Sequence, residues 1–255
     1  MIKIRLKEVS FDDLKGLVEK LDWVPIAQIL ARNREGRGKK PVFTPVMCFR
    51  AFLLGAQLEI EDDTELARRI SQNRDYAAFC GMPKAPSHDV LTDFRTNYHY
   101  KIKKAFDYFD GLLERLGAFK GDALSNDGTD VPVPMKNNQS PHQYHFGAKS
   151  DKKKFHGFWL MIACSVRHQI ARSFEVGYAR EGQITLCKDM LSYRRIDDSK
   201  ENYYFFMDGI FDCQEIYELI LEGQGKLPII AYNKRSSSYE SIEELPDDDW
   251  RFMYN

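Results

Sequence analysis

The stretch Tyr203-Tyr-Phe-Phe-Met-Asp-Gly-Ile-Phe-Asp212 decides the fold of the second half of this chain. Its first five residues form a short, fully apolar run, which is typical of a buried strand. Helical spacing of apolar residues precedes it over 181–195 and follows it over 213–222, and a further apolar run at 227–232 predicts another strand. Because helices join these later strands, we expect the strands to be parallel.

Three more strands are expected before this stretch. Residues 123–133 alternate like a strand, and residues 158–166 and 171–178 are apolar and rich in β-formers, with Gln169-Ile170 as a tight connection. We expect these three strands to be antiparallel. The resulting order, β-β-β-α-β-α-β, is typical of the ribonuclease-H-like fold, a mixed sheet with crossover helices in which the first and fourth strands are neighbours.

The first half has the spacing of a helical domain. Apolar residues at helical intervals, preceded by capping residues such as Ser10, Thr44 and Asp62, predict helices at 11–21, 23–31, 44–59, 62–72, 74–80, 87–98 and 98–116. We therefore expect two domains, a helical one at residues 1–121 and the mixed sheet at residues 122–255.

Composition excludes several classes of protein. With 255 residues, 43% hydrophobic and 29% charged, the chain has the composition of an ordinary globular protein. No apolar run approaches the ~20 residues that span a bilayer, and the N-terminus lacks the apolar core of a signal peptide. We expect a cytoplasmic protein with no membrane partner. Five cysteines without a C-x-x-C pair predict buried thiols rather than disulfides or a zinc site.

The formal net charge of −1 conceals an asymmetry between the two halves. Residues 1–121 carry 21 Lys and Arg against 17 Asp and Glu, a balance of +4, and residues 122–255 carry 16 against 21, a balance of −5. The helical half is therefore the better candidate for a polyanionic partner.

Two aspartates lie where the predicted sheet would bring them together. Asp127 lies within the first strand, beside Gly128, which leaves room for a ligand to approach the backbone. Asp208 follows the first parallel strand, at the carboxyl end where such sheets bind ligands. Paired carboxylates of this kind hold Mg²⁺, and two such ions act in phosphodiester chemistry. Taken singly, each aspartate is also explained as a turn residue. Asp130 and Asp212 are neighbours that could substitute, although Asp212 also fits a cap of the following helix.

Motifs along essentially the whole chain resemble those of bacterial insertion-sequence transposases. Residues 73–81 (Asn-Arg-Asp-Tyr-Ala-Ala-Phe-Cys-Gly) and 86–95 (Pro-Ser-His-Asp-Val-Leu-Thr-Asp-Phe-Arg) are similar to their helical N-terminal domain. Asp127-Gly-Thr resembles the first motif of their acidic-triad (DDE) catalytic domain. Asp208-Gly-Ile-Phe-Asp212 resembles the second, usually written Asp-x-Gly-Tyr-Asp, with the glycine one place early and Phe in place of Tyr. The segments beginning at Lys154 (Lys-Phe-His-Gly-Phe) and Leu227 (Leu-Pro-Ile-Ile-Ala-Tyr-Asn-Lys-Arg) resemble those of strands two and five.

The resemblance implies that Asp127 and Asp208 are catalytic residues that bind Mg²⁺ or Mn²⁺. In the family, a third ligand, a Glu, lies on a helix well beyond the fifth strand and close to an Arg. The residues after Arg235 contain no such helix. We therefore expect a chain that is truncated at its C-terminus, with weak or absent catalysis on its own.

Basic residues in three segments are candidates for DNA contact. The helices between 62 and 98 could form a helix-turn-helix, with residues 87–98 in the major groove. The candidate residues are Arg68, Arg69, Arg74 and Arg95 in that region, Arg32, Arg34, Arg37, Lys39 and Lys40 in a glycine-punctuated loop, and Lys149, Lys152, Lys153, Lys154 and His156 near the acidic site. The alternatives are ion pairs of Arg68 and Arg69 with Glu65 or Asp75, a plain exposed linker and an ordinary charged hairpin.

These observations favour a transposase that binds double-stranded DNA, at transposon ends and target, as a homodimer. Its reaction would be hydrolysis at the 3′ end of the element, followed by attack of that hydroxyl on target DNA. The alternative is an inactive relic that binds DNA and acts as a repressor or a dominant-negative partner. A stand-alone ribonuclease-H-like nuclease would need all its acidic ligands within this chain.

Overall fold

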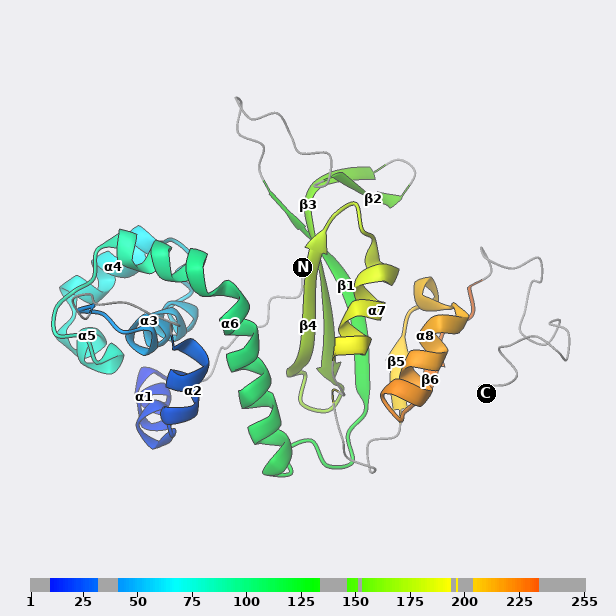
Figure 1. Cartoon of the computed structure of the whole chain (residues 1–255), viewed down its shortest axis with the longest axis horizontal. Coiled ribbons are helices and arrows are strands. Elements are labelled where there is room, and N and C mark those ends of the chain that lie inside the picture. Colours follow the sequence, from blue (N-terminus) through cyan, green and yellow to red (C-terminus); the bar gives the residue numbers. More distant parts are fainter. Residues whose placement is uncertain are drawn as a thin grey trace, which may run out of the picture. The chain divides into compact units, whose positions relative to one another are not determined.

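The chain divides into two compact units, Met1–Phe109 and Asp110–Asn255, in the computed structural model (Figure 1). The structure describes residues 10–31, 41–133, 146–150, 153–193, 196 and 204–233, with backbone alone at 146–150 and 153–154.

The first unit is helical, as predicted. Its helices are α1 (Phe11–Lys20), α2 (Val24–Leu30), α3 (Pro45–Gln57), α4 (Asp63–Gln72), α5 (Arg74–Cys80) and most of α6 (His88–Arg115). The predicted capping residues have this role: Ser10, Thr44 and Asp62 each accept a hydrogen bond from the backbone amide three residues later. The core is centred on α3, whose Ala51 and Leu54 are fully buried.

Helix α6 is a correction to the sequence prediction, which divided it at Tyr98. It continues for 28 residues from His88 to Arg115. No proline interrupts it, and Phe94, Tyr98 and Ala105 form one buried stripe across the predicted break. The helical period of this stripe is the physical reason for one helix rather than two.

The second unit contains a mixed sheet. Its strands are β1 (Leu124–Pro132), β2 (Phe146–Ser150), β3 (Lys153–Ser165), β4 (Ala171–Tyr178), β5 (Tyr204–Met207) and β6 (Leu227–Ile230). Five of them run in the order β4-β3-β1-β5-β6, and β2, which the sequence did not predict, pairs with the start of β3. Strand β3 is antiparallel to β1 and β4, whereas β5 and β6 are parallel to β1. The predicted directions are confirmed, and so is the pairing of the first strand with the strand that ends before Asp208.

One face of the sheet is covered by helix α7 (Gln183–Tyr193) and by α8 (Gln214–Glu218) with the π-helical turn Leu219–Gly223. The single regular helix predicted over 213–222 therefore divides into two parts. Met190 packs with Met161 and Phe205 in this core, and each is fully buried. Phe206 is a further correction: the apolar run 203–207 predicts a buried strand, but Phe206 lies on the opposite face and is 38% exposed. Side chains alternate along a strand, so adjacent phenylalanines cannot share one face.

A buried arginine connects the end of α6 to the sheet. Arg172 on β4 is fully buried and its Nε lies 2.5 Å from Oδ1 of Asp110. Its Nη2 donates to Glu114 at 3.2 Å and to the carbonyl of Ile196 at 3.0 Å, and the guanidinium stacks on Phe119. This cluster includes the last turns of α6 in the second unit. The sequence signal for this cluster is an arginine at the start of a predicted strand, Ala171-Arg-Ser-Phe.

Candidate acidic site

The two predicted aspartates occupy equivalent positions on neighbouring parallel strands. The ladder between β1 and β5 pairs Leu124 with Phe205 and continues to Asn126 with Met207. Asp127 is the next residue on β1, and Asp208 is the first residue after β5. Because neighbouring strands lie about 4.8 Å apart, one further step in the same register brings the backbones of Asp127 and Asp208 close together where β5 ends.

Both aspartates are exposed, and each accepts a hydrogen bond from the backbone amide of the residue that follows it. Oδ1 of Asp127 accepts the amide of Gly128 at 2.7 Å, and Oδ1 of Asp208 accepts the amide of Gly209 at 2.6 Å. Asp208 thereby caps the short 3₁₀ turn Gly209–Phe211. These bonds orient the carboxyl groups and leave the second oxygen of each without a hydrogen bond to the residues that the structure describes.

A buried layer lies behind the pair. Asn126 is 2% exposed, and its amide Nδ2 lies 3.2 Å from the sulfur of Met161 and 3.4 Å from that of Cys187. Burial raises the pKa of the Cys187 thiol to about 12, so it is a neutral packing group. The rigid layer holds β1 beneath Asp127, which is the kind of support that a precisely oriented site requires.

Gly128 has a different role from the one that the sequence suggested. A Cβ at this position would lie 2.9 Å from the side chain of Gln183 and 3.1 Å from that of Met161. The space beside the backbone is therefore filled by the start of α7 and by the core. The glycine permits close packing of α7 on β1 instead of ligand approach.

The two substitute aspartates have other surroundings. Asp212 is 6% exposed and its Oδ2 accepts the backbone amide of Asn233 at 3.0 Å. It therefore does not act as the predicted cap of α8, whose N-cap is Cys213, but connects the end of β6 to the turn after Asp208. Asp130 lies three residues beyond Asp127 on β1, opposite Trp159, and so belongs to the other face. Among the described residues, no group of three or more His, Cys, Asp or Glu side chains could hold a metal ion.

Asp122 is a structural residue just before β1. It is 7% exposed and accepts hydrogen bonds from the Ser165 hydroxyl and from the amides of Arg167 and Ala123. Burial raises the pKa of Asp122, but these hydrogen bonds outweigh burial, so the pKa lies below its ordinary value. The carboxylate stabilises the turn between β3 and β4.

The basic segment with Lys149, Lys152, Lys153 and Lys154 is not close to the acidic pair along the strands. Asp127 lies opposite Ile162 on β3, and Lys154 is eight residues further along that strand. At about 3.3 Å per residue this is roughly 26 Å of strand. Lys153 and Lys149 lie at the same end, in the β2–β3 ladder, and Lys152 lies outside the described residues. His156 also lies there, with Nδ1 3.1 Å from the carbonyl of Val133. The lysines were predicted to lie near the acidic pair, and this was wrong. Strand β3 begins at Lys153, five residues before the apolar run 158–166 from which the strand was predicted.

The motif that contains His156 has a structural reason for its glycine. A Cβ on Gly157 would lie 2.0 Å from the carbonyl oxygen of Val131 on the neighbouring strand. Only glycine permits β1 and β3 to approach this closely, so this position supports the ladder that carries Asp127.

The arginines of the helical unit are largely paired. An oxygen of the Glu65 carboxylate lies 2.5 Å from Nη2 of Arg68 and 2.8 Å from Nε of Arg69, which confirms the ion pairs given as the alternative to DNA contact. The hydrogen bonds from the two arginines lower the pKa of Glu65 to about 2. Arg95 pairs with Asp63 across two helices. Arg74 is exposed and forms no ion pair with the residues that the structure describes.

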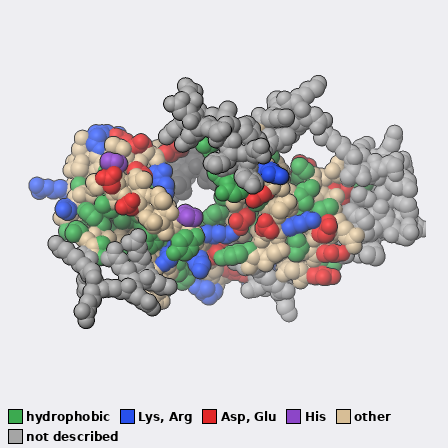
Figure 2. Space-filling model, turned by 45° about the horizontal axis from the view of Figure 1, so that its top comes forward, with side chains coloured by type: hydrophobic (Ala, Val, Ile, Leu, Met, Phe, Trp, Pro, Cys, Tyr) green, Lys and Arg blue, Asp and Glu red, His purple; other side chains and the backbone are tan. Residues whose placement is uncertain are grey.

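The loop with Arg32, Arg34, Arg37, Lys39 and Lys40 lies outside the described residues. On the face of the molecule shown in Figure 2, basic and acidic side chains are interspersed.

A comparison with known families finds a match in the first part of the chain. Residues 6–97 match the family model described as a transposase domain (DUF772). This range contains α1 to α5 and the first turns of α6, with both N-terminal motifs of the sequence. The match supports a transposase role and, with it, DNA as the partner. A comparison with curated proteins finds no match. Within the described ranges, no helix combines the length and apolarity needed to span a membrane.

Proposed function

We propose that this chain is a DDE transposase of an insertion sequence, with a ribonuclease-H-like second unit that cleaves and transfers DNA. The observation that carries the proposal is the register of β1 and β5, which aligns Asp127 with Asp208 at the edge of a mixed sheet. The strand order β4-β3-β1-β5-β6, in which β3 runs opposite to the other four strands, agrees with that fold. The transposase-domain match over residues 6–97 supports it independently.

The donor set fits a divalent metal ion. Two exposed carboxylates are hard oxygen ligands of the kind that hold Mg²⁺ or Mn²⁺. When bound, such an ion stabilises the negative charge that develops on a phosphodiester. Asp127 and Asp208 would bind the ion, while the bonds from Gly128 and Gly209 keep both carboxylates oriented toward it. Asn126 and Asp212 act as positioning residues behind the pair.

The helical unit supplies DNA binding in this proposal. Residues 88–98 of α6 carry exposed polar side chains that can contact base edges, including Asn97 and, once it exchanges its bond to Asp63, Arg95. Arg74 is available for a phosphate contact. Arg68 and Arg69 can bind DNA only by exchanging their bonds to Glu65, so we expect them to contribute less. Homodimer formation on DNA stays a prediction.

The proposal is tested with the full chain and a supercoiled plasmid in Mg²⁺ or Mn²⁺. Nicking or strand transfer that disappears in Asp127→Asn and Asp208→Asn, but persists in the exposed control Asp189→Asn, supports it. Loss of nicking should be at least 100-fold because both groups bind the same ion. Nicking that persists in both site variants would refute the assignment.

The same experiment addresses the alternative function. Salt-dependent DNA binding without any metal-dependent nicking would favour a DNA-binding protein that represses transposition. A salt slope near zero would remove the electrostatic argument for DNA binding altogether.

A further inference from the structure

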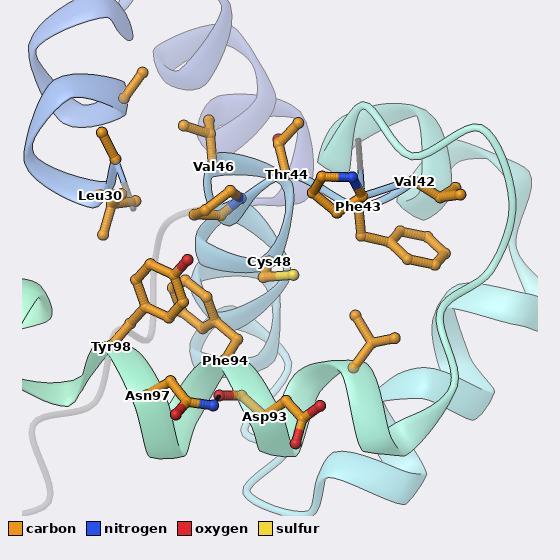
Figure 3. A pocket seen from close by; sticks show the side chains of 15 residues that line it. Leu30, Val42, Phe43, Thr44, Val46, Cys48, Asp93, Phe94, Asn97 and Tyr98 are labelled. Atoms are coloured by element: carbon orange, nitrogen blue, oxygen red, sulfur yellow. Dashed lines mark hydrogen bonds between the residues drawn. The ribbon is translucent and has the colours of Figure 1, made fainter. Parts of the chain in front are cut away.

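The middle turns of helix α6 carry positive charge. The buried side of the helix is turned toward α3, where Phe94 and Tyr98 point into a pocket that Cys48 also lines (Figure 3). The segment 94–106 contains no Asp or Glu, and its cations are Arg95, Lys101, Lys103 and Lys104. Helix α1, by contrast, has two Lys against three acidic residues, and the two arginines of α4 share Glu65. Of the helices described in this unit, α6 therefore has the largest group of cations without an acidic residue between them.

Two of these cations, Lys101 and Lys104, form no ion pair with a residue that the structure describes. Lys104 is exposed. Lys101 donates from Nζ to the carbonyl of Ala31, the C-cap of α2, and Nζ lies 5.6 Å from the ring centre of Tyr98 and 5.8 Å from that of Tyr100. An ammonium group carries three N–H donors, so these contacts hold the charge in place and leave donors for a second partner.

Both lysines share one face of the helix with Tyr100. Lys104 lies three residues after Lys101 and four after Tyr100, and residues at these separations are neighbours on a helix surface. The Tyr100 side chain is 53% exposed. The face therefore presents two ammonium groups and a phenol hydroxyl, which are donors of the kinds that bind phosphate oxygens.

The turns before this face have the opposite balance of charge. Residues 88–98 carry Asp89 and Asp93 against Arg95, a balance of −1 with His neutral, whereas residues 99–104 carry three Lys and no acid, a balance of +3. Arg95 is in addition paired with Asp63. A helix that contacts base edges through residues 88–98 therefore attracts phosphates mainly through the turns that follow.

We infer that Tyr100, Lys101 and Lys104 form a phosphate-binding face of the helical unit, which holds the backbone of duplex DNA. The inference rests on the proposed function in taking duplex DNA as the partner. It places the electrostatic contact on residues that lie beyond the matched range 6–97 and apart from the paired arginines of α4. Each lysine that neutralises a phosphate releases counterions, so binding through this face weakens with salt in a way that counts the contacts.

The test measures binding of the full chain to a labelled DNA duplex by fluorescence anisotropy, between roughly 50 and 200 mM salt. The double variant with Lys101→Gln and Lys104→Gln should lower the magnitude of the slope of log K against log salt by about 1.8, which is about 30-fold weaker binding at roughly 0.15 M salt. Lys104→Gln alone should lower it by about 0.9, and this exposed side chain can be changed without altering the contact with Ala31. The matched control, Lys15→Gln with Lys20→Gln, removes two exposed lysines from α1 and should leave the slope unchanged.

Each other outcome overturns the inference. Salt-dependent DNA binding with the same slope in the wild type and both α6 variants would place the phosphate contacts elsewhere and leave the proposed function intact. An equal decrease in the α1 control would show an effect of net charge rather than of this face. Tighter binding of a single-stranded RNA than of the duplex, lost in the α6 double variant, would assign the face to RNA. Absence of DNA binding by the wild type would count against the proposed function as well, which separates the two failures.

Discussion

Neutralising one aspartate of the acidic site should stabilise the metal-free protein. Asp127 and Asp208 directly follow the last residue pair of the β1–β5 ladder, whose strands lie about 4.8 Å apart, and neither has a cation among its described partners. Two like charges at that separation in a water-like environment repel by about 1 kcal/mol, and added salt screens the repulsion. Asp127→Asn or Asp208→Asn should therefore raise the free energy of unfolding by up to about 1 kcal/mol in EDTA.

Mg²⁺ should reverse this order of stability. A ligand that binds only the folded state stabilises it by about 1.4 kcal/mol when its free concentration is ten times the dissociation constant. The wild type should gain this amount, whereas either Asn variant should gain much less because half of the carboxylate pair is gone. For a chain of this size 1 kcal/mol corresponds to roughly 2–4 °C in Tm.

Urea unfolding in EDTA and in Mg²⁺, followed by circular dichroism, measures both effects. Asp189→Asn is the control, since this exposed carboxylate lies on α7 away from the pair. Equal stabilisation by Mg²⁺ in the wild type and both variants would refute the reasoning, and so would a loss of stability in EDTA when either charge is removed.

Three further predictions concern the framework of the site. Arg172→Ala should lower the free energy of unfolding by about 3–5 kcal/mol, because Asp110 loses its buried partner. The double variant with Arg172→Met and Asp110→Leu should recover much of the lost stability. If urea unfolding shows that Arg172→Ala costs less than about 1 kcal/mol, the prediction is contradicted. Gly157→Ala should cost about 1–3 kcal/mol because its Cβ would contact the Val131 carbonyl. The loss is measured by Tm and compared with Gly223→Ala, where the added Cβ meets no atom within 4 Å. Asp122→Asn should destabilise at neutral pH. Because the folded-state pKa of Asp122 is lowered, its contribution is complete above the unfolded pKa, near 3.9, and the gap between variant and wild type should close as acid titration passes below it.

Local chemistry was sufficient to predict most helix boundaries. Ser10, Thr44 and Asp62 start helices through hydrogen bonds that involve only the next three residues, and Gly81 ends α5 with φ of 70°. Such features are independent of distant contacts, so the sequence is enough to identify them. The pairing of Arg68 with Glu65 is equally local, since the two residues are three apart on one helix.

The predictions for α6, Phe206 and Gly128 were wrong because each depends on contacts between residues far apart in the sequence. The continuous α6 depends on a buried stripe that packs against other helices, and the sequence offers no signal at Tyr98 for or against a break. The environment of Phe206 depends on which face α7 covers. Gly128 was assigned a ligand role because the approach of Gln183 from a helix more than fifty residues away cannot be read from the strand itself.

The sequence by itself determined the two-part organisation, the element types and the places of the two aspartates, Asp127 within its strand and Asp208 after its strand, because hydrophobic periodicity, caps and motif order act over short distances. The tertiary structure decided which residues meet. Only the parallel register of β1 and β5 aligns Asp127 with Asp208, and only the antiparallel length of β3 separates the lysines from them. Strand pairing is set by the packing of the whole sheet and its helices, and no single segment carries that information.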